Sequence, residues 1–165
     1  MPERPYTYYD FTISLCPVCL KRVDAKIVFE NNQVFMLKSC ADHGFYKVLI
    51  ADDNRDAADS LAILLEGDGH EVRKAYDGVN AFVTALAFKP DIALLDIGMP
   101  GLSGYEVAQR IRAETWGDEI VLIALTGWGQ SQDKARALSA GFDHHVTKPV
   151  EPEKLQDLLS MGRRG

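Results

Sequence analysis

From Lys47 onward the sequence alternates between short apolar runs and longer stretches with helical periodicity, and this alternation constrains the fold more than any other feature. Near-continuous apolar strands are typical of parallel sheets whose two faces are both covered by helices. Five successive strand–helix units with right-handed crossovers predict a doubly wound α/β domain with a five-stranded parallel sheet. The predicted strands cover residues 47–52, 70–75, 91–95, 120–125 and 143–146, and the predicted helices cover 54–67, 78–88, 104–114, 130–140 and 151–160.

The first 46 residues have a different pattern. Residues 25–30 and 33–38 alternate in hydrophobicity around Asn31-Asn32, two residues that tolerate the positive φ of a tight hairpin turn. Only Gly44-Phe45-Tyr46 separates this hairpin from the first apolar run, so no flexible linker is expected. We therefore divide the chain into a small N-terminal module (1–46), an α/β domain (47–161) and a tail that is expected to fray (162–165). The direct junction leaves open whether this is a natural or an artificial fusion.

Composition and charge reduce the number of functions that this chain could have. Hydrophobic residues make up 47% of the 165 residues, which is ordinary for a globular domain, and no apolar stretch is long enough to cross a membrane. The N-terminus does not resemble a secretory signal, so a cytoplasmic location is expected. Residues 1–46 carry five basic and five acidic side chains, so the net charge of −6 lies in the α/β domain. An acidic domain repels phosphates, which argues on electrostatic grounds against direct nucleic-acid binding.

All three cysteines lie in the N-terminal module. Cys16 and Cys19 form a C-x2-C pair, and Cys40 is followed three residues later by His43. Two such pairs joined by a hairpin can supply three thiolates and one imidazole to a tetrahedral Zn²⁺, which would also stabilise a module too small for a large core. Free thiols and a redox-active C-x2-C pair remain alternatives, although redox pairs normally begin a helix.

Polar side chains follow the apolar runs of the α/β domain. Asp52 and Asp53 follow the first run, Asp96 the third, Thr126 the fourth and Lys148 the fifth. The carboxyl ends of parallel strands line one edge of the sheet, where ligands bind in such folds. Carboxylates suit Mg²⁺, and a hydroxyl and an ammonium group can contact a phosphoryl group. Each residue alone would more often be a helix cap, a turn residue or a solvated charge, but their ordered recurrence predicts a magnesium and phosphoryl site.

Residues 47–160 resemble the receiver domains of two-component response regulators. The matching segments are KVLIADD (47–53), LLDIGMPGLSGYE (94–106), IALTG (123–127) and AGFDHHVTKP (140–149). The resemblance implies a flavodoxin-like sheet in which the strands follow the order 2-1-3-4-5. Two-component signalling implies a histidine kinase or a phosphotransfer protein as the phosphodonor partner, and a downstream protein that binds the face made by residues 130–160.

The resemblance also implies a role for each residue of the site. Asp96 would be the phosphoacceptor. Asp53 would bind Mg²⁺ directly, Asp52 would assist through water, and Gly98 would offer its backbone carbonyl. Thr126 and Lys148 would contact the phosphoryl group, and the bond between Lys148 and Pro149 would be cis.

Three positions tune or depart from the usual receiver pattern. His145 occupies the position of an aromatic switch residue that commonly moves together with Thr126, and its imidazole would add pH sensitivity; an ordinary surface histidine is the alternative. Gly98 has no side chain to position a water molecule, and Trp128 is large enough to shield the phosphoryl group. We therefore expect slow to moderate loss of the phosphoryl group.

Two other functions remain open. A magnesium-dependent phosphatase with an aspartyl nucleophile would usually carry a second Asp two residues after the first, where this chain has Gly98. Alternatively, the chain could be a zinc-ribbon adaptor with a passive α/β scaffold. Residues 9–46 weakly resemble the zinc-ribbon-like segment that precedes some radical-SAM enzymes, but the CxxxCxxC motif of those enzymes is absent. As no output domain is expected after residue 160, the protein would signal by docking, relay a phosphoryl group or form part of a hybrid kinase.

Overall fold

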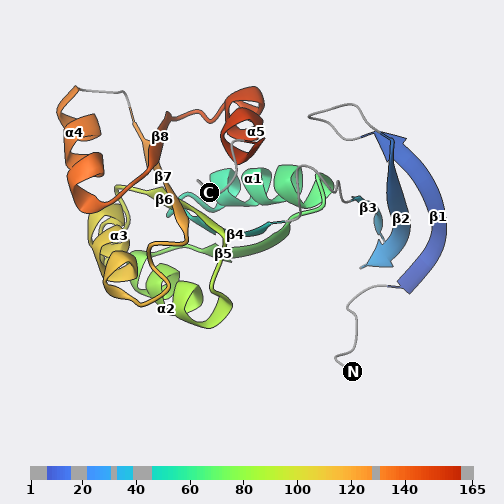
Figure 1. Cartoon of the computed structure of the whole chain (residues 1–165), viewed down its shortest axis with the longest axis horizontal. Coiled ribbons are helices and arrows are strands. Elements are labelled where there is room, and N and C mark those ends of the chain that lie inside the picture. Colours follow the sequence, from blue (N-terminus) through green and yellow to red (C-terminus); the bar gives the residue numbers. More distant parts are fainter. Residues whose placement is uncertain (1–6, 16–21, 31–32, 39–45, 128–130, 161–165) are drawn as a thin grey trace.

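The computed structural model describes residues 7–15, 22–30, 33–38, 46–127 and 131–160. These residues form a small antiparallel sheet and a larger α/β domain (Figure 1). No helix in this described part is both long enough and apolar enough to span a bilayer.

The α/β domain consists of five strands that alternate with five helices, as the sequence predicts. The parallel sheet has the order β5-β4-β6-β7-β8, which is 2-1-3-4-5 when the strands of this domain are counted alone. The predicted doubly wound, flavodoxin-like fold is therefore confirmed. The strands are β4 (Lys47–Ala51), β5 (Glu71–Ala75), β6 (Ile92–Asp96), β7 (Val121–Thr126) and β8 (His144–Thr147); the helices are α1 (Arg55–Gly67), α2 (Gly78–Phe88), α3 (Gly104–Ala113), α4 (Ser131–Ala140) and α5 (Pro152–Ser160).

The core lies in two layers, one on each face of this sheet. Along β4, Val48 and Ile50 pack with α1 and α5, whereas Leu49 and Ala51 pack with α2, α3 and α4. This two-residue alternation follows from the pleat of a strand, and it explains why the strands read as continuous apolar runs. All five residues of the central strand β6 are buried, including the terminal Asp96.

Local side-chain contacts fix where the helices begin and end. The side chain of Asn54 accepts a hydrogen bond from the Ala57 N–H at the start of α1. At the start of α2, the side chain of Asp77 accepts one from the Asn80 N–H. Ser103 and Glu106 form a capping box at the start of α3. At the end of α2, Lys89 adopts a left-handed conformation with a φ of 47°.

The N-terminal module contains one strand more than the sequence predicts. β2 (Arg22–Glu30) and β3 (Gln33–Lys38) form the predicted hairpin, although Asn31-Asn32 themselves lie outside the described residues. β1 (Thr7–Leu15) extends this pair into a three-stranded antiparallel sheet with the order β1-β2-β3. A register shift between Tyr8 and Asp10 breaks the two-residue period of β1, which explains why alternation did not reveal the strand.

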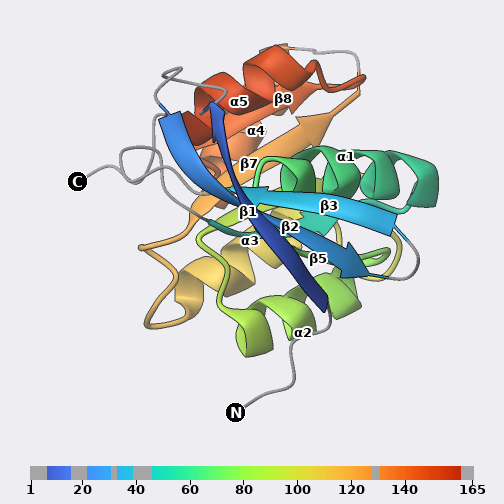
Figure 2. The ribbon, with the colours of Figure 1, turned by 90° about the vertical axis from the view of Figure 1, so that its right-hand side faces the viewer.

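Tyr46 anchors the start of the α/β domain. Its backbone N–H donates to His70 Nδ1 at 3.2 Å, and its carbonyl accepts a hydrogen bond from the Glu71 N–H at 3.0 Å. The rings of Tyr46 and His70 are stacked, with centroids 5.6 Å apart. The same end of the domain faces the N-terminal sheet, and β3 lies beside α1 (Figure 2).

Candidate functional site

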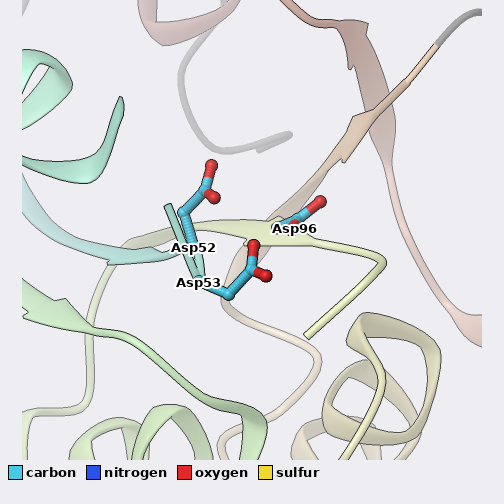
Figure 3. A group of neighbouring side chains, drawn as sticks. All are labelled: Asp52, Asp53 and Asp96. Carbon is cyan, nitrogen blue, oxygen red and sulfur yellow. The ribbon is translucent and has the colours of Figure 1, made fainter. Parts of the chain in front are cut away.

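Three carboxylates meet at the carboxyl edge of the parallel sheet. Asp52 and Asp53 directly follow β4, and Asp96 is the last residue of the neighbouring strand β6. One carboxylate oxygen from each residue lies within 4.8 Å of the others (Figure 3). The structure thus brings together the three aspartates that the strand-end argument placed at this edge.

Asp52 is fully buried and is held by its neighbours. Its backbone N–H donates to the Ala75 carbonyl on β5, and its Oδ1 accepts a hydrogen bond from the Asn54 N–H at 3.0 Å. Asn54 in turn caps α1, so one short turn fixes both the helix and the buried carboxylate. Asn54 is not among the residues predicted for the site, although an Asn directly before an apolar helical stretch is a typical capping signal.

Lys148 supplies the positive charge of the site. Its Nζ lies 2.9 Å from Asp52 Oδ2 and 3.1 Å from Asp96 Oδ1, so one ammonium group bridges two carboxylates. The peptide bond to Pro149 is cis, as the resemblance implied. The Lys148 N–H donates to the Thr126 carbonyl at 2.7 Å, which ties the end of β8 to the end of β7.

The electrostatics of the site reflect this crowding. Burial raises the pKa of Asp96, and the nearby charge of Asp52 raises it further; Lys148 and the backbone N–H of Gly98 oppose the rise. Burial alone would lower the pKa of Lys148, but its contacts with Asp52 and Asp96 raise it overall. Lys148 therefore stays charged, while negative charge at Asp96 remains costly without a further cation.

Thr126 and two glycines complete the surroundings of Asp96. Thr126 is buried, and its hydroxyl lies 3.5 Å from the Val146 carbonyl, to which it donates. A Cβ on Gly104 would lie 2.4 Å from the backbone oxygen of Asp96, so only glycine lets α3 begin this close to the strand end. A Cβ on Gly98 would lie 3.9 Å from Asp96 Oδ2, which leaves the space beside this carboxylate open.

A cleft of about 510 Å³ opens beside Lys148, between the first turns of α1 and the segment after β8. Its wall combines charged and polar groups of the site with an apolar patch, so a partner could insert a side chain next to the ammonium group. This cleft depends on side-chain geometry and was not evident from the sequence. The residues that line it are Asp52, Asn54, Ala57, Ser60, Leu61, Gly127, Lys148, Pro149 and Val150.

His145 lies on β8, where it pairs with Ala124, and its side chain is exposed. Together with the half-buried His144 it lines a separate hollow of about 370 Å³ between α4 and α5. The proposed switch position therefore points away from the carboxylates in this structure.

Several predicted residues lie outside the described part of the chain. They are the four candidate zinc ligands Cys16, Cys19, Cys40 and His43, together with Trp128. The zinc site and the shielding role of Trp128 therefore stay predictions.

The donor set at the sheet edge suits a hard divalent cation. Carboxylate oxygens are the ligands that Mg²⁺ prefers, and a few of them with water complete its shell. A cation there would also offset the mutual repulsion of Asp52, Asp53 and Asp96. Of the described residues, these three form the candidate metal centre.

Comparison with known families agrees with this geometry. The family model described as "Response regulator receiver domain" matches residues 48–160, which is more than half of the chain. The chain belongs to the response-regulator receiver family. It is thus a receiver domain of the two-component type, as the sequence motifs suggested. The chain also matches the family model of the "HMPTM N-terminal zinc ribbon domain" over residues 8–52, which agrees with the prediction of a zinc-ribbon-like module.

Curated relatives match the receiver part. The DNA-binding dual master transcriptional regulator RpaA of Synechocystis is 35% identical over 109 residues, which cover 66% of this chain and 45% of that protein. The phosphate regulon transcriptional regulatory protein PhoB of Pseudomonas aeruginosa is also 35% identical, over 66% of this chain and 47% of its own length. The chain thus spans about half the length of these regulators. An uncharacterized 14.6 kDa protein of Leptolyngbya boryana is 33% identical and is covered over 86% of its length.

Solved structures show the same fold. The chemotaxis protein CheY4 of Vibrio cholerae superposes with a TM-score of 0.68 at 26% identity, covering 72% of this chain and 99% of that one. The receiver domain of the sensor histidine kinase PA1611 of Pseudomonas aeruginosa, with a magnesium ion in its active-site cleft, gives a TM-score of 0.66 at 28% identity. That comparison covers 72% of this chain and 98% of the PA1611 domain.

Proposed function

We propose that this receiver takes a phosphoryl group from a phosphohistidine onto Asp96 and thereby changes a neighbouring surface. The observation that carries the proposal is the position of the Lys148 ammonium group, which bridges Asp52 and Asp96 at the edge of a three-carboxylate cluster. Such an arrangement can neutralise an anion that arrives at Asp96.

The metal would be held by Asp53 directly, by Asp52 through water, by the Asp96 carboxylate and by the carbonyl of Gly98. These oxygen donors fit Mg²⁺, and the receiver domain of PA1611 carries this ion in its own cleft. When bound, Mg²⁺ supplies charge neutralisation for the phosphoryl oxygens.

In the transfer step, a carboxylate oxygen of Asp96 attacks the phosphorus atom in line with the bond to the leaving group. The new O–P bond forms as the N–P bond of the phosphohistidine breaks, and the imidazole nitrogen leaves with the electron pair of that bond. Lys148 stabilises the negative charge on the phosphoryl oxygens throughout. The cleft beside Lys148 offers the partner kinase or phosphotransfer protein a place to insert the side chain.

The output signal would pass from Asp96 through the side chain of Thr126 to strand β8. Its hydroxyl now donates to the Val146 carbonyl on β8, and a phosphoryl group on Asp96 would compete for this donor. Loss of the contact with β8 would shift the population of states on the α4–β8–α5 face, where His145 lies. This face would bind the downstream partner.

For the N-terminal module, we propose a closed structural zinc site formed by Cys16, Cys19, Cys40 and His43. The support is the C-x2-C and C-x2-H spacing together with the match to a zinc-ribbon family model. Metal analysis of the purified protein should find one zinc per chain, and Cys40→Ser should lose it.

The decisive experiment is labelling with a small phosphodonor such as acetyl phosphate in MgCl2, followed by intact-mass measurement. We expect one phosphoryl group per chain, no label in Asp96→Asn, and normal labelling in the control Asp118→Asn, whose side chain is exposed away from the cluster. The label should persist for longer than seconds, because Gly98 offers no side chain to position water. Continuous turnover of the donor would instead favour the phosphatase, and label retained in Asp96→Asn would overturn the proposal.

A further inference from the structure

Helix α2 differs from the other four described helices in its lack of charge. Its eleven residues, GVNAFVTALAF, include no Asp, Glu, Lys or Arg, whereas each of the other helices carries three or more charged residues. An exposed helix without charged side chains is unusual in a soluble domain, because the solvent-facing side normally carries them.

The outer face of α2 carries an apolar stripe. Val79, Val83 and Leu86 are 50%, 55% and 38% exposed, and their spacing of four and three residues places them on one line along the helix. The inner face of α2 is distinct from this stripe and is already packed in the core, because Ala81 and Ala85 are fully buried against the sheet. The stripe therefore does not contribute to the core of this chain.

The two ends of α2 carry opposite charges. Asp77 precedes the helix as its N-cap, at the sheet edge that holds the carboxylates. Lys89 follows the last turn, and Lys47 and Arg73 lie 5.1 Å and 5.2 Å from the centroid of the Phe88 ring. Arg73 also pairs with Glu71 at 3.2 Å and Asp91 accepts a hydrogen bond from the Lys47 N–H, so these three cations and two carboxylates leave one net positive charge at this end. The helix thus runs from an acidic end to a basic end, with an uncharged middle.

The terminal charges and the apolar stripe are arranged nearly symmetrically about Val83. Asp77 lies six residues before Val83 and Lys89 six residues after it, while Val79 and Leu86 flank Val83 at four and three residues. Two copies of α2 that pack antiparallel around a two-fold axis at Val83 would place Val79 of each near Leu86 of the other. The same arrangement would bring each acidic end close to the basic end of the other copy.

We propose that the α2 stripe is an interaction surface for a second copy of this chain. The surface is complementary to itself, because its uncharged centre avoids like-charge repulsion across the two-fold axis and its oppositely charged ends attract each other. A stripe of two helical turns is smaller than the roughly 800 Å² per partner of a standard stable interface, so the association is weak and concentration-dependent. It is independent of the phosphorylation proposed above, because none of its residues belongs to the carboxylate site.

Sedimentation velocity of the full chain over a wide concentration range tests the proposal. We expect a shift from monomer toward dimer that Val83→Glu weakens by at least about tenfold, a change that corresponds to about 1.4 kcal/mol. Ile63→Glu is the matched control, since Ile63 is 71% exposed on α1 and lies outside the stripe. Leu138→Glu serves the same purpose on α4, where the side chain is 67% exposed.

A mixing experiment addresses the two-fold geometry itself. Val83→Glu and Val83→Lys should each be mainly monomeric, but an equimolar mixture should regain association, because residue 83 of one copy faces residue 83 of the other. Unchanged thermal unfolding and Asp96 labelling would show that the variants fold. The proposal is overturned if the wild type stays monomeric at every concentration, if Leu138→Glu abolishes the dimer while Val83→Glu does not, or if the mixture stays monomeric.

Discussion

At the residue scale, the site is defined by an excess of negative charge. Asp52, Asp53 and Asp96 share one edge of the sheet with a single ammonium group, that of Lys148. One positive charge does not offset three carboxylates, so without a bound cation the folded state carries a repulsion that the unfolded chain lacks. A cluster with this excess of negative charge is therefore expected to cost stability when no cation is bound.

The first prediction concerns Asp53, the exposed member of the cluster. Without added metal, Asp53→Asn should raise Tm by about 2–4 °C, the shift expected for about 1 kcal/mol in a chain of this length. MgCl2 should raise the Tm of the wild type by mass action and that of the variant much less. Thermal unfolding with and without MgCl2 measures both effects. Asp118→Asn should behave like the wild type, and an unaltered response to MgCl2 in Asp53→Asn would contradict the assigned metal contact.

A second prediction concerns Arg112, which holds the opposite edge of the sheet together. Its guanidinium donates to the carbonyls of Gly117, Ile120 and Gly141 and pairs with Asp143 at 2.7 Å. Arg112→Met leaves these partly buried acceptors without their donor and should lower the free energy of unfolding by about 3 kcal/mol. Urea unfolding gives the value.

Two further variants sharpen this test. Arg112→Lys should recover less than half of the loss, because a single ammonium cannot reach all the acceptors that the planar guanidinium reaches. Arg110→Met is the control on the same helix, since Arg110 is exposed, lies over the ring of Phe82 and interacts with the charge of Glu106 on the surface; its cost should stay below about 1 kcal/mol. Equal losses of stability for Arg110→Met and Arg112→Met would show that the hydrogen bonds and ion pair of Arg112 do not hold this edge of the sheet together.

At the element scale, strands and helices of the α/β domain were predictable because local and tertiary requirements coincide. Central strands buried on both faces must be apolar throughout, and each predicted strand of this domain appears within two residues of its expected bounds. β1 was missed because its bulge at Tyr8/Asp10 disrupts the alternation that marks a strand. The order of the strands came from the resemblance to receiver domains, since periodicity alone does not say which strands are neighbours.

The candidate site was predictable to a similar extent and for a similar reason. The side chains of Asp52, Asp53 and Asp96 had to meet because parallel strands end at one edge. The role of Asn54 and the cleft beside Lys148 could not be foreseen, because both depend on how side chains pack around a turn.

The third prediction compares two glycines at helix ends. A Cβ on Gly78, at the start of α2, would lie 1.8 Å from the Leu102 carbonyl oxygen, whereas a Cβ on Gly67, at the end of α1, would meet nothing within 4 Å. Gly78→Ala must push the loop before α3 away and should cost about 1–3 kcal/mol. Gly67→Ala should be neutral or stabilise by about 0.5 kcal/mol. Urea unfolding of both variants measures the contrast, and similar values for the two would contradict it.

At the scale of the whole molecule, the small antiparallel sheet lies next to the receiver, with β3 beside α1. Tyr46, the last residue of the N-terminal module and the first described one after β3, bonds through its backbone N–H to His70 and through its carbonyl to Glu71 at the start of β5. Tyr46 is therefore anchored to the receiver fold, and one of its two backbone hydrogen bonds depends on the protonation state of the His70 imidazole.

The last prediction follows from that imidazole. Burial lowers the pKa of His70, with Asp68 opposing the effect weakly, and the Tyr46 N–H requires an unprotonated Nδ1. Above the ordinary value of 6.5, His70 is neutral in both states, so its contribution to stability is complete. As the pH falls from there toward the lowered folded-state pKa, the unfolded chain binds a proton more readily and stability declines.

His70→Asn removes this titration while its amide oxygen can still accept the hydrogen bond from Tyr46. Urea unfolding between about pH 5 and pH 8 should therefore show a shallower loss of stability on acidification in His70→Asn than in the wild type. Ile63→Asn, which changes an exposed side chain on α1 and no titratable group, should keep the wild-type slope. All three proteins share the same carboxylates and the same N-terminal module, so only the difference in slope reports on the contact between His70 and Tyr46. Identical slopes in all three would mean that protonation of His70 does not weaken the anchoring of Tyr46.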